Sequence, residues 1–515
     1  MLKALNLKIE ETEETSYNFF ERIQEKMMDK ESQKKTIGSI EEELFKDIME
    51  LGRRMLQEHV DKRGDGDVGK LIEREDGKKL PHKRRGEKQL ETLFGRIKVE
   101  RIGYGYPEEQ SIFPQDKEMG LPENMYSYPI QKRVCREAVL GSYDEIDKTL
   151  SEYTGAHVPK RQCMGIIKQG AEYVDEFYKQ RGGRETEAEL IVLSGDGKGI
   201  VMRPEGLREK TREREVSQKM SKRVSKGEKR NKKREAMAAA VYNIKTQVRS
   251  VDDIIEELDR DKTGKEENKV CSEEKRVWAS IKKEKDEVFE EILEEGLKRN
   301  PTEKKVVFLS DGAKSVQKRA EEILRPGFEG KSKSFVIILD LIHVIEYLWK
   351  AAYVFYEEGS SEAELWVKQY LRMILEGNAK KAAAEMKRLA IEKNLSKSKQ
   401  MIVDKAAGYI LNNQEYMRYD EYLASGYPIA TGVIEGVCGH LIKDRFEISG
   451  ARWGLDGAES LLKLRADYQS GDWDEYWKFH TEQSLNSLYP KNHWVSANAI
   501  EKTKLIVIQG GKTST

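Results

Sequence analysis

Hydrophobic positions along this chain follow two patterns. Continuous apolar runs rich in Val, Ile and Leu occupy residues 188–202, 305–311 and 334–340, and the run 237–251 adds further β-prone residues. Short runs of this kind predict buried strands. Between them, apolar residues recur at spacings of three and four, which predicts amphipathic helices. The order of strands and helices over residues 188–340 predicts a mixed α/β sheet.

The patterns change along the chain, and the changes predict seven regions. An apolar stripe made of Leu44, Ile48, Leu51 and Met55 predicts a helix near the N-terminus. We expect the highly charged residues 252–299 to be helical. The seven regions are a helical region at 1–60, a β-hairpin-rich region at 61–125, a helix-turn-helix-like region at 126–184, the first part of the α/β core at 185–344 with a basic insert at 204–234, an all-helical block at 345–427, the rest of the core at 428–481, and a tail at 482–515.

The region 126–184 carries a helix-turn-helix pattern. Ser142, with Glu145 three residues later, can cap the first helix, Gly155 can end it, and Pro159 suits the start of the second. Basic residues lie on the second helix, which enters the DNA major groove in such motifs. They are Lys160, Arg161 and Lys168. An ordinary helical hairpin has the same pattern, so DNA contact is one of two interpretations.

Charge is balanced overall and uneven locally. The 515 residues include 92 basic and 92 acidic side chains, a balance that counts mildly against DNA binding because phosphate contacts need Lys and Arg. Residues 216–234, however, hold nine basic side chains and one acidic side chain. This segment is either a solvated loop or an arm along the DNA backbone. On the second interpretation its contacts include Lys229, Arg230, Lys232, Lys233 and Arg234.

Cysteine spacing and hydropathy indicate the cellular compartment in which the protein works. Cys135, Cys163, Cys271 and Cys438 show neither a CxxC pair nor disulfide spacing, which is typical of reduced thiols in the cytoplasm. No stretch approaches 18 consecutive apolar residues, so we expect no membrane span. The first residues lack the apolar core of a signal peptide. We therefore expect a cytoplasmic protein.

Three acidic residues stand where a metal site can form. Asp196 and Asp311 each end an apolar strand in the sequence pattern, and the glycine after each predicts a sharp turn. Glu435 lies near the start of a helix, beside an apolar face that can pack on the sheet. Each residue alone has an ordinary explanation, a turn for either Asp-Gly and a solvated position for Glu435. Together, in the order strand, strand, helix, they predict carboxylate ligands for Mg²⁺ or Mn²⁺.

Further candidates lie near these acids in the sequence. Asp340 and His343 are either a helix cap and a core histidine, or His343 reaches the metal site or a DNA phosphate. Four residues that follow Glu435 are candidate DNA contacts on the one interpretation, and surface charge and helix packing on the other. They are Lys443, Arg445 and Arg452 for phosphates and Trp453 for stacking on an exposed base.

Together these motifs resemble the ISKra-type bacterial insertion-sequence transposases, relatives of the Mutator-like group. The resemblance spans roughly residues 85–480. It is carried by TLFGRIKVERIGY, LSGDGKGIVMR, SDGA and LDLIHVIEYLW, and above all by IATGVIEGVCGHLIKDRFEISGARWGLDGAESLLKLRA. Members often carry paired cysteines after the hairpin region. The segment YGYPEEQSIFPQDKEMGLP has none, which argues against a zinc element there.

The resemblance implies an RNase H-like catalytic core with Asp196, Asp311 and Glu435 as its acidic triad. It also implies that the helical block 345–427 is an insertion in that core, and that Asp340 and His343 form the family's Asp-or-Cys-x-x-His element. The fold is then α/β, an RNase H-like mixed-sheet core interrupted by an all-helical insertion. Helical and β-hairpin DNA-binding regions precede that core.

The activity implied by the resemblance is DNA transposition by two-metal-ion phosphoryl transfer. Asp196 would bridge two Mg²⁺ or Mn²⁺ ions about 3.5–4 Å apart, and Asp311 and Glu435 would hold one each. These ions would assist hydrolysis at the element's ends and joining of the freed 3′-hydroxyl to target DNA.

The expected partners and location follow from that reaction. We expect double-stranded DNA as a partner, at least a homodimer because two element ends are handled together, and a bacterial cytoplasmic, nucleoid-associated location. Two alternatives stay open. One is a domesticated DNA-binding protein without catalysis, and the other is an RNase H-like nuclease that cuts without joining.

Overall fold

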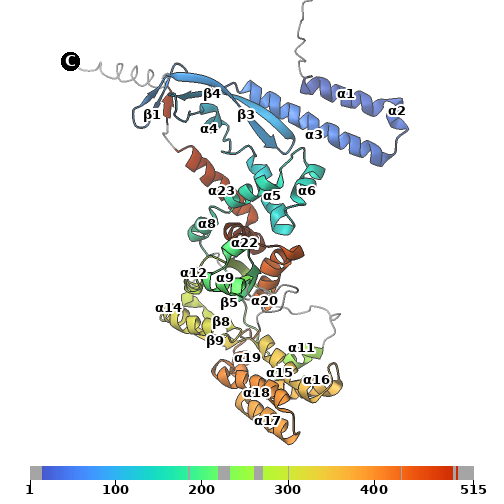
Figure 1. Ribbon diagram of the computed structural model, residues 1–515, viewed down its shortest axis with the longest axis vertical. Helices are drawn as coiled ribbons and strands as arrows, with labels where there is room; N and C mark the ends of the chain where they lie inside the picture. Colours follow the sequence, from blue (N-terminus) through green and yellow to red (C-terminus); the bar gives the residue numbers. More distant parts are fainter. Residues whose placement is uncertain are drawn as a thin grey trace, which may run out of the picture. The chain divides into compact units, whose positions relative to one another are not determined.

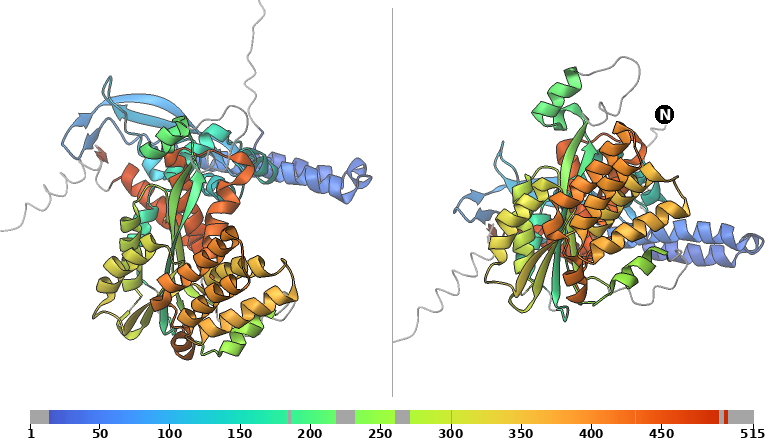
Figure 2. Two further views of the ribbon diagram at one scale, coloured as in Figure 1. Left: turned by 60° about the horizontal axis from the view of Figure 1, so that its bottom comes forward. Right: turned by 90° about the horizontal axis from the view of Figure 1, so that it is seen from below.

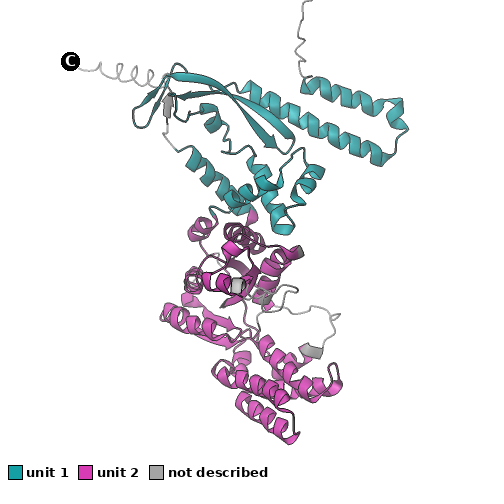
Figure 3. Ribbon diagram, in the orientation of Figure 1, with its two compact units in different colours: residues 1–173, 474–515 teal, residues 174–473 magenta. Residues whose placement is uncertain are grey.

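The chain forms two compact units, residues Met1–Tyr173 with Asp474–Thr515, and residues Val174–Trp473 (Figure 3). The computed structural model describes residues 14–183, 186–217, 232–259, 271–299, 301–430, 432–490 and 494–496. For Glu435, Ser449 and the residues of helices and strands beside some gaps, it describes the backbone alone. The candidate residues of the acidic site all belong to the second unit.

The first unit joins a helical hairpin to a long β-hairpin (Figure 1). Its helical hairpin consists of α1 (Ser16–Met28), α2 (Lys30–Gln33) and α3 (Ile37–Lys62). Strands β3 (His82–Thr92) and β4 (Gly95–Gly105) pair antiparallel along their whole length. A small sheet has the strand order β10-β1-β2 and is built from β1 (Ile72–Arg74), β2 (Lys79–Leu80) and β10 (Trp494–Ser496).

Helices complete the first unit. They are α4 (Pro114–Glu118), α5 (Tyr128–Leu140), α6 (Ile146–Tyr153), α7 (Lys160–Gly170) and most of α23 (Trp473–Leu488). The pair α6–α7 is the predicted helix-turn-helix-like pair, although Glu145 rather than Ser142 precedes α6 and makes no side-chain cap. Gly155 donates its N–H to the Leu93 carbonyl at 2.9 Å, which ties the turn between α6 and α7 to the β3–β4 hairpin. Helix α23 runs past residue 482, where the sequence pattern places the start of the tail.

The second unit is built on a mixed five-stranded sheet with the order β7-β6-β5-β8-β9. The strands are β5 (Leu190–Val201), β6 (Lys233–Ile244), β7 (Glu273–Ser280), β8 (Lys305–Ser310) and β9 (Ser334–Leu339). The first three pair antiparallel, and β8 and β9 run parallel to β5. The mixed α/β sheet predicted from the sequence is therefore confirmed.

One strand lies where the sequence predicts helix. Within residues 252–299, helix α11 (Val251–Asp259) and helix α12 (Lys285–Leu297) flank strand β7, and the prediction of continuous helix is wrong there. The β7 sequence EEKRVWAS is charged in its first half and buried only in its last four residues. A strand that leaves the core half-way lacks the continuous apolar run by which buried strands are recognised.

Helices cover both faces of this sheet (Figure 2). Successive residues of a strand point to opposite faces. On one face, a Cβ at Gly195 would lie 3.6 Å from Cδ1 of Ile292 in α12. The other face packs on the helical block 341–424, because Leu190 and Val192 share one buried apolar cluster with Leu348 and Ile410.

The helical block lies between strand β9 and the helix that contains Glu435. It consists of α15 (Leu341–Phe355), α16 (Ser361–Leu375), α17 (Ala379–Glu392), α18 (Lys397–Asn412) and α19 (Tyr419–Ala424). Because its core is continuous with that of the sheet, the block is part of the second unit and not a separate module. No helix in the described part of the chain is long and apolar enough to cross a bilayer.

Candidate active site

Asp196 and Asp311 lie where two parallel strands part. The pairing of β5 with β8 ends at Ser194 opposite Leu309. The same register, continued by two residues, sets Asp196 beside Asp311, the first residue after β8. Both side chains are half-buried. Burial raises the pKa of Asp311, and the negative charge of Asp196 adds to that rise, as expected of neighbouring carboxylates.

Asp196 does not end its strand, which corrects the sequence-based prediction. Strand β5 continues through Asp196 to Val201, and its residues stay paired with β6 as far as Val201 opposite Lys233. Gly197 therefore makes no sharp turn. It lies opposite Met237, and a Cβ there would collide with the Glu235 side chain of the neighbouring strand. Its small size serves packing between strands rather than a turn.

Asp311 is followed by the turn that the sequence predicts. Gly312 has φ +82°, a left-handed conformation that favours glycine. Oδ1 of Asp311 accepts the N–H of Ala313 at 2.8 Å. Burial is the largest cause raising the Asp311 pKa, and the Ala313 hydrogen bond opposes it. An ionised Asp311 beside Asp196 is thus costly for the chain, and a cation nearby would relieve that cost.

The helix that contains Glu435 lies against Asp196. Glu435 belongs to α20 (Gly432–Gly436), and its side chain is outside the described part of the chain. The helix continues as a π-helical segment, η5 (Val437–Lys443). Sγ of Cys438 in this segment donates to Oδ2 of Asp196 at 3.1 Å. Cys438 is three residues after Glu435, so the backbone of the glutamate helix is fixed close to Asp196.

Asp340 and His343 take different roles. Asp340 is 1% exposed and caps α15 by accepting the Ile342 N–H at 2.9 Å, as the simpler interpretation has it. His343 is half-buried, and its charge acts to lower the Asp311 pKa, which places it near the acid pair. The structure thus favours the cap for Asp340 and proximity to the acids for His343.

Tyr409 and Lys198 also adjoin the site, and the sequence did not single them out. The hydroxyl of Tyr409, in α18, donates to the Asp311 carbonyl at 2.8 Å, and its ring stacks on Tyr347 with centroids 4.0 Å apart. Lys198 is two residues after Asp196 in the same strand and therefore points to the same face of the sheet. Strand periodicity could have identified Lys198, whereas the contact of Tyr409 depends on the packing of a distant helix.

Two of the candidate DNA contacts after Glu435 are buried. Trp453 is 7% exposed and donates its Nε1–H to the Phe446 carbonyl at 3.1 Å. Arg445 is 3% exposed, with its guanidinium 5.0 Å from the centre of the Trp453 ring. The prediction of base stacking by Trp453 and phosphate contact by Arg445 is corrected, because both side chains are packed inside the protein. Lys443 and Arg452 are exposed.

The second helix of the helix-turn-helix-like pair has an exposed basic face. Arg161, Met164, Gly165 and Lys168 follow the spacing of one helical face in α7, and all four are exposed. Lys160 is exposed and forms an ion pair with Asp144. The structure thus leaves Arg161 and Lys168 on an accessible surface, as a DNA-contacting helix requires.

The basic insert is described only at its ends. Lys229 and Arg230 lie outside the described residues. Lys233 pairs with Glu447 at 3.1 Å, and Nε of Arg234 donates to the Ile281 carbonyl at 2.9 Å. Lys232 is half-buried. Lys233 and Arg234 thus contact neighbouring elements of the second unit.

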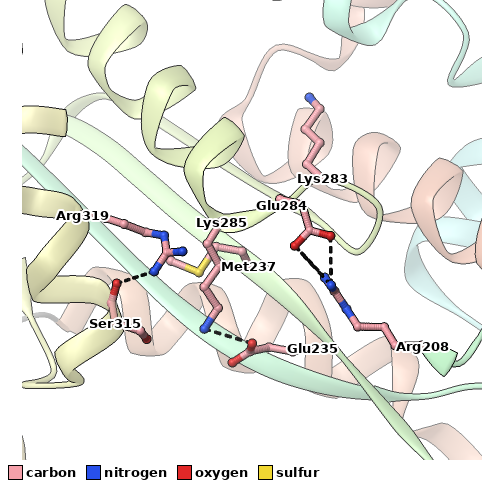
Figure 4. A pocket seen from close by; sticks show the side chains of 8 residues that line it. All are labelled: Arg208, Glu235, Met237, Lys283, Glu284, Lys285, Ser315 and Arg319. Carbon is pink, nitrogen blue, oxygen red and sulfur yellow. Dashed lines mark hydrogen bonds and ion pairs between the residues drawn. The ribbon is translucent and has the colours of Figure 1, made fainter. Parts of the chain in front are cut away.

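A charged hollow of about 440 Å³ lies on the other face of the same strands (Figure 4). Glu235 and Met237 of β6 line it, on the face toward which Gly195 and Gly197 point. Lys285 pairs with Glu235 at 3.0 Å, and Arg208 pairs with Glu284 at 2.9 Å. Because its cations are already matched by carboxylates, the hollow is an ion-paired support for the sheet.

Among the described side chains, no group of three or more His, Cys, Asp or Glu residues is arranged to hold a metal ion. The side chain of Glu435 is outside that set. The described part of the site therefore consists of two neighbouring carboxylates, with the backbone of a glutamate-containing helix beside them.

Comparisons with known proteins do not identify a family for this chain. No protein-family model matches the chain, and no curated protein matches it. Among solved structures, the Drosophila P element transposase strand transfer complex is similar over 74% of this chain and 86% of that one, with 10% identity and a TM-score of 0.24. A likeness of this degree carries no functional argument, so function is argued from the site.

Proposed function

We propose that this protein is a DNA transposase that cleaves the ends of an insertion sequence and joins them to target DNA. Asp196, Asp311 and Glu435 would together hold two Mg²⁺ or Mn²⁺ ions at an RNase H-like core. Double-stranded DNA is the proposed partner. The proposal rests on the second unit, where the acidic residues come from two strands and one helix far apart in the sequence.

One observation carries the proposal. The register of β5 and β8 sets Asp196 beside Asp311, and the Cys438 thiol ties the glutamate helix to Oδ2 of Asp196. Asp196 and Cys438 are 242 positions apart in the chain. Structural stability alone gives no reason to bring two half-buried acids together, since like charges repel. A cation bound by both carboxylates does give a reason to bring them together.

The sheet supports the same proposal. Three successive antiparallel strands are followed by two strands parallel to the first, in the order β7-β6-β5-β8-β9. This mixed sheet is consistent with the proposed RNase H-like core and supports the proposal. The first strand carries Asp196, and Asp311 directly follows the fourth. The glutamate helix follows the helical block, as the resemblance to the ISKra-type transposases implies.

The donor groups fit a hard divalent cation. Carboxylate oxygens suit Mg²⁺ and Mn²⁺ better than softer metals. Oδ2 of Asp196 accepts from the Cys438 thiol and Oδ1 of Asp311 accepts from the Ala313 N–H, which orients both carboxylates. When bound, the cations supply the charge that makes a water or 3′-hydroxyl nucleophilic and stabilises the leaving oxygen.

The residues around the acids position the site. Cys438 fixes the orientation of the Asp196 carboxylate, and Tyr409 fixes the backbone of Asp311. His343, when protonated, would offset part of the negative charge on Asp311. Burial and the Asp196 carboxylate raise the pKa of the Cys438 thiol, and the charges of Lys198 and Lys443 oppose that rise. Both ammonium groups therefore lie near the acids, where a DNA phosphate would approach.

The test is metal-dependent cleavage of DNA that carries the element's own ends. Wild type should cut in Mg²⁺ or Mn²⁺ and join the 3′-ends to a target plasmid, whereas Asp196→Asn should do neither. Asp404→Asn makes the same change at an exposed position of α18 and serves as the control. Equal activity of wild type and Asp196→Asn would contradict the site. Cutting without joining would favour the nuclease, and DNA binding without cutting would favour the non-catalytic alternative.

A further inference from the structure

Helix α3 leaves an apolar face exposed along much of its length. Phe45, Ile48 and Met55 are 45%, 46% and 56% exposed. Helix α1 packs against a different side of α3, where Asp47 pairs with Lys26 at 2.7 Å and the Arg54 guanidinium lies 4.5 Å from the centre of the Phe19 ring. Helix α1 runs beside α3 (Figure 1), and its contacts are on a side of α3 other than the exposed face.

The exposed positions have the spacing of a helix-pairing seam. Phe45, Ile48, Gly52, Met55 and His59 are separated by three, four, three and four residues. That alternation keeps one stripe facing a partner helix. The predicted stripe that included Leu44 and Leu51 is divided in the structure, since these two residues are half-buried.

An apolar hollow of about 300 Å³ lies at the C-terminal end of the seam. Leu56, His59 and Val60 of α3 line it, together with residues of the β3–β4 hairpin. Phe94, at the turn of that hairpin, covers Gly52, where a Cβ would lie only 2.5 Å from Cδ1 of the ring, and Phe94 is still 40% exposed. The seam and the hollow therefore form one continuous apolar surface in the first unit.

The seam and the hollow together place apolar or aromatic residues at matching distances on either side of Gly52. Ile48 and Leu56 lie four positions to either side of Gly52, and Phe45 and His59 lie seven. Two copies of α3 that run antiparallel about a twofold axis near Gly52, with the Phe94 rings between the helices there, would match these positions with one another. Such self-complementarity is what a twofold interface between identical chains requires.

The charges on α3 follow the same symmetry. Glu41 and Glu42 lie ten and eleven positions before Gly52, and Lys62 and Arg63 lie ten and eleven positions after it. All four are exposed. In an antiparallel pair the two acids of one copy would face the two bases of the other at both ends, whereas a parallel pair would set like charges together.

We infer that α3 is a homodimer interface, in which a second copy of this chain packs antiparallel on the exposed face. Phe45 of one copy enters the hollow beside Leu56 and His59 of the other. Both Phe94 rings lie near the twofold axis. The partner on this face is a second copy because the apolar positions and the charges of α3 are both arranged symmetrically about Gly52. A helix of another protein would have no reason to match that symmetry. The inference does not depend on the proposed catalysis.

The first experiment measures self-association of the full chain by sedimentation equilibrium. Wild type should be dimeric. Phe45→Ala should weaken the dimer about tenfold or more, because an aromatic ring that fills a pocket of the partner contributes strongly to binding. Tyr17→Ala removes a ring that is 67% exposed on α1 and should have no effect. Circular dichroism of each variant checks that α3 is still folded.

The second experiment tests the antiparallel pairing by charge exchange. Glu41→Lys with Glu42→Lys should dissociate the dimer, as should Lys62→Glu with Arg63→Glu. All four changes in one chain, or an equimolar mixture of the two double variants, should restore it. A wild-type monomer at every concentration, or a dimer that survives both double variants and Phe45→Ala, would overturn the inference.

Discussion

At the scale of single residues, the acid pair depends on side chains that the chain brings in from several elements. Cys438 contacts Asp196, Tyr409 contacts the Asp311 backbone, and His343 moderates the Asp311 charge. None of these three is adjacent in sequence to the acid it serves. Residue types and spacing predict the acids, but long-range packing decides what surrounds them.

Lys198 is the residue beside the acids whose role is easiest to test. It is half-buried on the face of β5 that carries Asp196, and it has no ion-pair partner among the described residues. If it binds a DNA phosphate, Lys198→Ala should reduce cleavage and lower the salt dependence of DNA binding by about one ion. Lys198→Arg should recover most of both. Lys405→Ala, at an exposed site in α18, is the control. An unchanged salt dependence in Lys198→Ala would refute the phosphate contact.

His480 gives the first unit a predictable response to pH. It is 2% exposed, and burial lowers its pKa from 6.5 to about 4. Because the folded protein binds the proton more weakly than the unfolded chain, stability is intact above pH 6.5 and is lost as pH falls toward 4. The loss should approach roughly 3 kcal/mol at pH 4. Thermal melts of wild type and His480→Gln should show a steeper acid dependence for wild type, and parallel curves would contradict this.

At the scale of elements, the helical block and the site are joined through one turn. Gly312 has φ +82°, and a Cβ there would lie 2.7 Å from the Tyr409 hydroxyl and 3.0 Å from Cδ1 of Leu339. Helix α18 therefore packs directly on the turn that presents Asp311. A disturbance of this contact should reach the site without changing any acidic residue.

Two glycine substitutions separate the contact from backbone strain. Gly312→Ala should lower the free energy of unfolding by about 2–4 kcal/mol, since it adds overpacking to left-handed strain. Gly330→Ala meets the same kind of strain at φ +68° but has open space around it, and should cost only about 1 kcal/mol. Denaturant titration of both variants gives the difference. Equal losses of unfolding free energy in the two variants would show that the side chains of Tyr409 and Leu339 move aside at no cost.

The elements also show where sequence patterns stop being informative. The buried strands β8 and β9 end close to where the apolar runs end. The apolar run 188–202 predicts the full length of β5. Pairing with β6 as far as Lys233 keeps the strand continuous through Asp196, where the Asp-Gly pattern alone predicts its end. Strand β7 was missed because only half of it is buried. Patterns of burial are predictable from sequence, whereas pairing beyond the core is not.

At the scale of the whole molecule, DNA binding is expected from surfaces and not from net charge. The chain has equal numbers of acidic and basic residues, and many of the cations are paired. The exposed face of α7 is the described surface that best fits a recognition helix.

Arg161→Ala with Lys168→Ala should weaken DNA binding and reduce the slope of affinity against salt by about two. Lys148→Ala with Lys46→Ala, at two other exposed positions of the first unit, is the control. Fluorescence anisotropy at several salt concentrations measures both effects. A slope that stays at its wild-type value would assign α6–α7 to an ordinary helical hairpin.

The central claim is that Asp196, Asp311 and Glu435 jointly bind divalent cations. Its most direct test is X-ray diffraction from crystals soaked in Mn²⁺, collected at the manganese absorption edge. We predict anomalous peaks within bonding distance of carboxylate oxygens from all three residues, and their loss in Asp196→Asn. No peak at the acid pair, or a Glu435 side chain that points away from an ion bound there, would contradict the account.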